Sequence, residues 1–379
     1  MSTISLFGTL VDTIKQHYEL PEILNVYLMP SRRSHAAGSD SVYRLVTAQD
    51  SYVLRPFRTD ASAAINLHNQ FLDWSEQRNI SFTQRIIKTK NGESFYQTEE
   101  GKWWLSSYIE AEPAFEWTKP TWSVQACEQS GLALYRLHCA LKQFGGQSST
   151  ISLSIASKTF ENSVCAGLVE RFAQALSGNQ GVARDADNVV ALVSDAVAQI
   201  CRGGGSLDFS IEGKLTDRLA ERKPNDYLAE YQLIHGDFHP GNVLFSDGKA
   251  VAVIDFEYLS VEPPLYDLAY ALIMFCTQWP QTQPAAESQI VNTDGAIDLA
   301  KMQSFLKGYL MDVLPRFDAL PFRPDLLIPY MNVAAAICMT WFLERGLEDR
   351  TVQHFINVVK QLQNLSTMDV LRAIGERST

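Results

Sequence analysis

The residues best suited to chemistry lie in one polar segment, HGDFHPGN, which covers residues 235–242. A further carboxylate, Asp255, ends an apolar run eighteen residues after Asp237. Asn242 and Asp255 carry the hard oxygen ligands that Mg²⁺ prefers, and Asp237 is a separate carboxylate. Phosphoryl transfer needs both kinds of group, because cations must neutralise the phosphate charge while a carboxylate orients the attacking hydroxyl. The segment therefore indicates phosphoryl-transfer chemistry.

A short hairpin is expected to bring Asn242 and Asp255 together. Residues 243–245 and 251–255 read as two strands, and the dipeptide Asp-Gly between them is a turn signal. Both polar residues then lie at the open end of the hairpin. The two glycines and the proline of HGDFHPGN favour a fixed, non-helical loop. A zinc pair made by its two histidines would need both on one helix face, so the loop disfavours that alternative.

The surrounding pattern changes from strands to helices along the chain. Short strands and one helix are expected first, at residues 41–46, 51–55, 61–77 (the helix), 82–88, 94–97 and 103–109. Helical periodicity starts near residue 121 and continues to the end, at 160–177, 186–201 and 268–275 among others, interrupted by a small β unit at 231–255. We therefore expect an α+β fold. A small antiparallel-sheet lobe would cover residues 1–110, and a larger, mostly helical lobe would cover 111–379.

HGDFHPGN, followed by IDFE and then YDLAYAL, resembles the aminoglycoside phosphotransferase/choline kinase-like superfamily. The details look most like its bacterial homoserine-kinase-type members. These proteins are small-molecule relatives of the protein kinases, in which HGD matches the HRD catalytic loop and IDFE takes the place of DFG. The resemblance implies a two-lobed protein-kinase-like fold with ATP and Mg²⁺ as cofactors. It also implies transfer of the γ-phosphate to a hydroxyl of an amino alcohol, an aminoglycoside or a sugar.

The resemblance implies roles for the residues of these motifs. Asp237 would be the catalytic base, supported by His235. Asp267 would brace the catalytic loop, although an acid at the start of the following helix would also suit the helix dipole. Magnesium would be held by the oxygen-bearing residues Asn242, Asp255 and Glu257. For Glu257, an ordinary surface position is the alternative.

In the small lobe the resemblance implies a nucleotide site. Arg55 would contact phosphate, with an ordinary surface arginine on an edge strand as the alternative, and Val53 on the same strand face would cover adenine. Residues 35–41 stand where a phosphate-covering loop is expected. Backbone groups from the connection between the lobes would bind adenine, at Ser107, Tyr108 and Ile109.

One position departs from the kinase pattern. Kinases pair the strand cation with a glutamate of the following helix, whereas this helix carries His68, Asn69 and Gln70 there. Its acids, Asp73 and Glu76, come later. The sequence thus leaves the partner of Arg55 open.

For the acceptor, the sequence offers aromatic and acidic side chains. Trp341 and Glu344 are three residues apart, on one helix face, and an aromatic ring with a carboxylate suits an ammonium group. A core tryptophan and a solvated acid are the alternatives. Tyr258 lies closer in sequence to the catalytic motifs.

Composition limits the remaining possibilities. The 379 residues are 46% hydrophobic and carry a net charge of −11, which argues against a nucleic-acid partner. The N-terminus lacks the basic start and long apolar stretch of a secretory signal. Apolar windows at 268–276 and 328–343 read as core helices rather than membrane spans. Six scattered cysteines indicate buried free thiols and a cytoplasmic protein. The oligomeric state stays open.

Three rivals to a small-molecule kinase follow from the same residues. A protein Ser/Thr kinase would share the fold. A non-catalytic nucleotide-binding module is suggested by Arg55 and the missing helix glutamate, although the presence of Asp237, Asn242 and Asp255 argues against it. A metal-dependent hydrolase would call for histidine-rich ligation, which the segment lacks.

Overall fold

The chain is divided into two compact units. The computed structural model describes residues 3–29, 42–57, 62–99, 101–111, 122–147, 167–177, 186–203, 232–279, 295–311, 324–344 and 349–366. The first unit comprises Met1–Trp117 and Gly241–Leu259, and the second comprises Thr118–Pro240 and Ser260–Thr379. The border between Pro240 and Gly241 falls within HGDFHPGN. The phosphate-covering loop expected at 35–41 lies outside the described residues.

The first unit is built on an antiparallel sheet of order β1-β2-β3-β6-β4, with β5 paired to β6. The strands are β1 (Ile23–Leu28), β2 (Tyr43–Thr47), β3 (Ser51–Pro56), β4 (Ile86–Ile87), β5 (Tyr96–Thr98) and β6 (Gly101–Ser107). The hairpin expected around residues 47–50 is present, whereas the strand expected at 82–88 is reduced to β4. Because β3 lies between β2 and β6, Arg55 is not on an edge strand, and that alternative is wrong.

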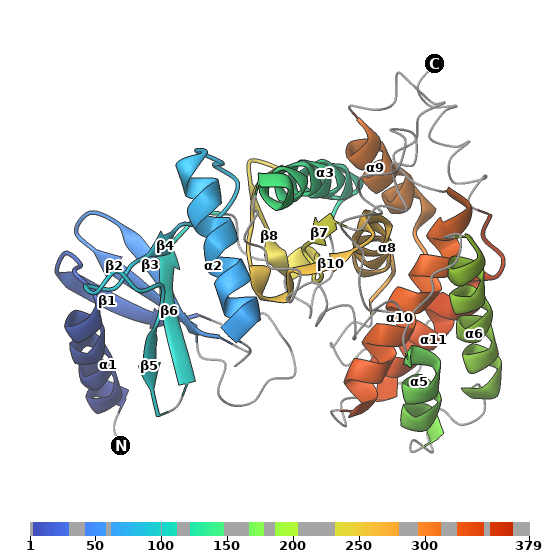
Figure 1. Ribbon diagram of the computed structural model, residues 1–379, viewed down its shortest axis with the longest axis horizontal. Helices are drawn as coiled ribbons and strands as arrows, with labels where there is room; N and C mark the ends of the chain where they lie inside the picture. The colour runs from blue at the N-terminus through green and yellow to red at the C-terminus, as the bar shows by residue number, and fades with distance from the viewer. Residues whose placement is uncertain are drawn as a thin grey trace, which may run out of the picture. The chain divides into compact units, whose positions relative to one another are not determined.

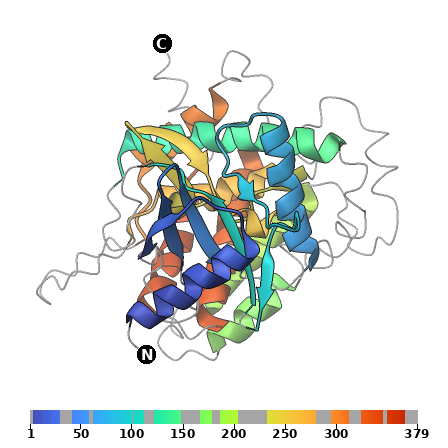
Figure 2. The ribbon, with the colours of Figure 1, turned by 90° about the vertical axis from the view of Figure 1, so that its left-hand side faces the viewer.

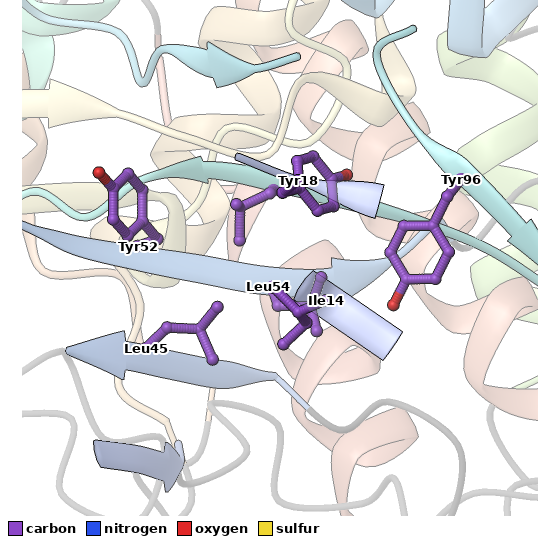
Figure 3. Close-up of a cluster of buried hydrophobic side chains, with 7 residues drawn as sticks. Ile14, Tyr18, Leu45, Tyr52, Leu54 and Tyr96 are labelled. Atoms are coloured by element: carbon purple, nitrogen blue, oxygen red, sulfur yellow. The ribbon is translucent and has the colours of Figure 1, made fainter. Parts of the chain in front are cut away.

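Two helices cover opposite faces of this sheet, α1 (Thr3–His17) and α2 (Ser62–Gln77). In Figure 2, α1 lies in front of the strands. Figure 3 shows its Ile14 and Tyr18 beside Tyr52 and Leu54 of β3, in the buried core of this unit. On the other face, His68 of α2 meets the ring of Trp104 of β6. The alternation along β3 therefore points Arg55 to the α2 face.

The hairpin that carries Asp255 also belongs to the first unit. It consists of β8 (Val243–Ser246), β9 (Lys249–Val253) and a turn at Asp247 and Gly248, which both adopt positive φ. The Val253 N–H donates to the carbonyl of Phe82 at 2.8 Å. A 3-10 turn, η2 (Phe256–Tyr258), follows, and its Phe256 ring meets Phe71 of α2 with centroids 5.0 Å apart.

The second unit is mostly helical (Figure 1). Its helices are α3 (Val124–Gln147), α5 (Leu168–Ser177), α6 (Ala186–Gly203), α8 (Pro264–Phe275), α9 (Leu299–Leu310), α10 (Leu327–Glu344) and α11 (Asp349–Leu362), with a 3-10 turn, η5 (Pro324–Leu326). A two-stranded ladder of β7 (Gln232–Ile234) and β10 (Ser260–Glu262) leads into and out of the hairpin segment. Helix α10 packs against α5, α6, α8 and α11, and α3 packs against α9. The α3–α9 crossing is close, because a Cβ on Gly131 or Gly308 would overlap the facing helix backbone.

The most apolar long helix behaves as a core element. Among the described residues, α10 is the one helix long and apolar enough to cross a membrane, and 61% of its window is buried inside the structure. This agrees with the core helix expected at 328–343. Among the cysteines whose side chains the structure describes, Cys127, Cys276 and Cys338 are buried, but Cys139 is exposed, so the expectation of a buried thiol fails at Cys139. Helix α8 begins at Pro264, four residues before the expected start, and β10 was not foreseen.

Candidate active site

The loop at residues 235–239 is held by one buried carboxylate, Asp267, from the first turn of α8. Asp267 Oδ2 accepts the backbone N–H of His235 at 2.9 Å, and Oδ1 accepts that of Gly236 at 3.1 Å. Gly236 has φ 76°, a conformation that glycine adopts without strain. His138 of α3 adds a contact from Nε2 to Oδ2 at 3.1 Å, and its Nδ1 contacts the Tyr309 hydroxyl at 2.8 Å. Asp267 thereby fixes the backbone immediately before Asp237.

The Asp237 carboxylate is oriented by a phenol. The Tyr270 hydroxyl donates to Asp237 Oδ1 at 2.7 Å, and His239 Nε2 lies 3.5 Å from Oδ2. Burial, together with the negative charge of Asp237, raises the pKa of Tyr270 well above its usual value, so the phenol stays a donor. Burial and the charge of Asp237 also raise the pKa of the Cys338 thiol on α10. The Asp237 N–H donates to His235 Nδ1 at 3.2 Å, within the loop.

In the first unit, Arg55 is a buried cation with two carboxylate partners. Its Nη2 lies 2.8 Å from Asp255 Oδ1 and 2.8 Å from Glu257 Oε1. Burial alone would lower the pKa of Arg55, but the two carboxylates outweigh it and the net shift is upward. Its guanidinium carbon lies 5.4 Å from the centre of the Trp104 ring. Arg55 is 7% exposed, so the interpretation as a surface arginine is wrong. Both carboxylates share Nη2, which is one of the three guanidinium nitrogens.

The helix position without a glutamate is occupied by His68, which is fully buried. Burial lowers the pKa of His68 to about 4, so the ring is neutral at physiological pH. Its Nδ1 contacts Asn69 Oδ1 at 3.0 Å, whereas its Nε2 has no hydrogen-bond partner among the described residues. With Nδ1 as the donor, Nε2 carries a lone pair. The helix thus supplies no negative charge to Arg55.

The hairpin places the expected metal ligands on neighbouring backbone. Val243 pairs with Val253, and the Ile254 N–H donates to the carbonyl of Asn242 at 2.9 Å. Asn242 and Asp255 are both buried, and Asp255 adopts a left-handed backbone (φ 71°, ψ 59°). Among the described residues, no three His, Cys, Asp or Glu side chains gather in a way that could hold a metal ion. The donors here are amide and carboxylate oxygens, which fit Mg²⁺ rather than zinc.

HGDFHPGN itself is not an α-helix. Only its last residues turn, as the 3-10 helix η1 (Pro240–Asn242). The arrangement that a helical zinc pair of His235 and His239 would need is therefore absent from this described segment.

The residues expected to bind adenine lie at the end of β6. The Ser107 N–H donates to the carbonyl of Arg85 at 2.8 Å, and the Tyr108 N–H donates to that of Ser51 at 2.9 Å. The Ile109 N–H makes no hydrogen bond within the described part of the chain. Of the three backbone donors, Ile109 is thus the one available to a base. Val53 is half-buried on the same strand as Arg55.

The three acceptor candidates are found in different settings. Tyr258 belongs to the first unit and is 42% exposed. Glu344, at the end of α10, forms an exposed ion pair with Arg171 at 2.8 Å. Trp341 is half-buried against Phe342, with ring centroids 4.9 Å apart. It follows Cys338 by three residues and so shares a helix face with that thiol.

Comparison with known proteins identifies the family. The sequence model of the phosphotransferase enzyme family matches residues 32–304, which is most of the chain. The chain belongs to the phosphotransferase enzyme family. The family resemblance inferred from HGDFHPGN and IDFE is thereby confirmed.

Individual known proteins resemble the chain over different lengths. The homoserine kinase of Granulibacter bethesdensis is 31% identical over 96 residues, and this match spans 25% of the chain and 25% of that kinase. A choline kinase from Cryptosporidium parvum Iowa II superposes with a TM-score of 0.59 at 13% identity, covering 97% of this chain and 99% of the other. The amicoumacin kinase hAmiN, solved with AMP-PNP, Ca²⁺ and Ami, gives 0.56 at 14% identity, covering 94% and 93%. The two-lobed protein-kinase-like fold is therefore confirmed.

Proposed function

We propose that this phosphotransferase-family protein is an ATP-dependent kinase that moves the γ-phosphate of ATP to a hydroxyl group of a small molecule. The observation that carries the proposal is the doubly held Asp237. Asp267 fixes the backbone before it, and Tyr270 fixes its carboxylate at 2.7 Å. Such fixation suits a group that must meet a hydroxyl in one geometry.

In the second unit, Asp237 orients the acceptor hydroxyl and takes its proton. The hydroxyl oxygen forms a bond to the γ-phosphorus, the bond from that phosphorus to the β–γ bridging oxygen breaks, and ADP leaves. His235 supports the loop, since its ring accepts the Asp237 N–H. No covalent phospho-enzyme is part of this scheme.

In the first unit, the chain's own residues hold the nucleotide. Arg55 supplies positive charge and N–H donors to the phosphate oxygens. Val53 covers the base, and the backbone of residues 107–109 hydrogen-bonds it, with Ile109 supplying the N–H. Asn242 and Asp255 are the groups that would hold Mg²⁺. When bound, that ion neutralises phosphate charge.

We assign nucleotide binding to residues 1–110, and catalysis and acceptor binding to residues 111–379, except that the hairpin segment Gly241–Leu259 adds its metal ligands to the first unit. Among the acceptor candidates we favour Trp341, because it lies on α10, which packs against α8, the helix that carries Tyr270. Glu344 and Tyr258 are the other candidates, although Glu344 already pairs with Arg171. A ring and a carboxylate would favour an acceptor with an ammonium group. We place the protein in the cytoplasm, where ATP is abundant.

The test measures ADP release from Mg-ATP across a panel of acceptors. The panel contains homoserine, other amino alcohols, aminoglycosides, sugars and a Ser/Thr peptide, and each is assayed with the wild type and with Asp237→Asn. We expect release that depends on one class of small molecule and falls at least about a thousandfold in the variant.

The other outcomes separate the rivals. Transfer to the peptide alone would indicate a protein kinase. Nucleotide binding without turnover on any acceptor would favour a non-catalytic binding module. Equal release by the wild type and Asp237→Asn would remove Asp237 from its assigned role.

A further inference from the structure

We propose that Glu257 is a positioning residue that fixes the guanidinium of Arg55, rather than a ligand of a second metal ion. The inference rests on the proposed kinase function and assigns a role that the sequence left open. It concerns groups of the first unit alone: Arg55 on β3, Glu257 on η2, and His68 on α2.

The geometry of the pair is that of a buried ion pair. Arg55 Nη2 lies 2.8 Å from Glu257 Oε1, and the two side chains are 8% and 2% exposed. Asp255 accepts from the same nitrogen at 2.8 Å. One nitrogen is thus held by two carboxylates, which lie two residues apart in the sequence. These two contacts fix the orientation of the guanidinium group.

The helix offers no competing anchor for Arg55. At the place where a helix carboxylate would stand, the side chain is the neutral imidazole of His68, packed on Trp104 with centroids 4.7 Å apart. A buried guanidinium needs negative charge beside it, because desolvation of an unpaired charge costs several kcal/mol. Asp255 and Glu257 supply that charge from the hairpin side instead.

The two carboxylates differ in the ligands beside them. A divalent cation bound by either one would lie close to the Arg55 guanidinium in a poorly solvated region, where like charges repel strongly, so the ion would need further oxygen ligands. Asp255 has a neighbouring oxygen ligand in Asn242, through the hairpin register. We therefore assign the metal to Asn242 and Asp255, and Arg55 to Glu257.

The experiment combines Glu257→Gln with Arg55→Met in a double-mutant cycle on the full chain. Glu257→Gln keeps the size of the side chain and removes its charge. The matched control is Glu262→Gln, which changes another buried glutamate, five residues along and in the second unit. Circular dichroism and thermal melting of every variant report whether it is folded.

Two readouts separate an anchor from a metal ligand. If Glu257 acts through Arg55, Glu257→Gln lowers kcat/KM for ATP by about tenfold to a hundredfold. The loss disappears in the Arg55→Met background. Electron paramagnetic resonance titration with Mn²⁺ and AMP-PNP then gives the wild-type number of bound ions and the wild-type affinity. Glu262→Gln changes neither readout by more than about twofold.

The opposite results would overturn the inference. Loss of one bound Mn²⁺, or a rise of more than about tenfold in its dissociation constant that persists with Arg55→Met, would make Glu257 a metal ligand. If the loss in kcat/KM of the double variant equals the product of the losses of the two single variants, Glu257 does not act through Arg55. If Glu257→Gln does not fold, Glu257→Asp replaces it, and the same two readouts apply.

Failure of the kinase proposal is distinguishable from failure of this inference. If the wild type binds AMP-PNP but turns over no acceptor, the kinase proposal fails. The Arg55–Glu257 pair is then tested by the affinity for AMP-PNP. Glu257→Gln weakens this affinity at least about fivefold when Arg55 is present, and changes it less than about twofold in the Arg55→Met background. A change that is equal in both backgrounds would overturn the inference.

Discussion

Replacing Tyr270 by phenylalanine removes one atom that the structure places 2.7 Å from Asp237 Oδ1. The phenol is buried, and its raised pKa keeps it protonated, so it donates to the carboxylate throughout the working pH range. A hydrogen bond to a charged group contributes about 1.5–3 kcal/mol. If that energy orients Asp237 for the acceptor hydroxyl, Tyr270→Phe lowers kcat by about tenfold to 150-fold.

The assay is steady-state phosphoryl transfer with saturating Mg-ATP and the best acceptor of the panel. We expect the loss in kcat, with KM for ATP unchanged, because Tyr270 belongs to the second unit and the groups assigned to the nucleotide belong to the first. The acid limb of the activity profile should also move to higher pH, since the phenol favours the charged form of the carboxylate it serves.

A matched control lies one helical turn away. Tyr266 is on the same helix, is also buried, and its pKa is likewise raised by burial, yet its hydroxyl makes no hydrogen bond to Asp237. Tyr266→Phe should therefore keep kcat within about threefold of the wild type. The reasoning is refuted if folded Tyr270→Phe retains wild-type kcat, or if both variants lose activity equally.

Two further predictions concern buried groups of the second unit. Asp267→Asn leaves one oxygen for the three N–H groups that converge on Asp267. We therefore expect the free energy of unfolding, measured by chemical denaturation, to fall by about 3–5 kcal/mol, and kcat to fall at least about a hundredfold. A variant of unchanged stability and activity would contradict the bracing role. Burial lowers the pKa of His354 to about 3, so the folded ring stays neutral while the unfolded ring takes up a proton near pH 6.5. Its contribution to stability is complete above pH 6.5 and is lost by about 1.4 kcal/mol per pH unit down to pH 3. His354→Phe should flatten the thermal stability profile in that window, and an unchanged slope would argue against a neutral buried imidazole.

The catalytic segment could be found in the sequence because its signals are local. Gly, Pro and the Asp247-Gly248 turn restrict the backbone over a few residues, and two short β patterns then predict the hairpin register that joins Asn242 to Asp255. The change from period-two to helical patterning likewise predicts the α+β class. These features depend on neighbours within about twenty residues, which a single sequence displays.

The strands that the sequence did not define correctly depend on where their pairing partners lie in the sheet. β4 is short because only Ile86 and Ile87 pair with β6. β10 forms because β7 offers its edge to residues 260–262. The choice of pairing partner produces no hydrophobic periodicity in either paired segment, so it is not visible in the sequence of that segment.

The sequence by itself determined which groups are chemically able to transfer a phosphoryl group, since side-chain type and local spacing fix that. Only the tertiary structure decided what each group touches. Arg55 meets Asp255 across 200 residues of chain, and Tyr270 meets Asp237 across 33. At the helix position where kinases carry a glutamate, the neutral ring of His68 is tolerated because the negative charge that Arg55 needs comes from Asp255 and Glu257 of the hairpin segment. Burial makes such pairings obligatory, since an unpaired charge is costly away from water, but burial is a property of the packed chain and not of any one segment.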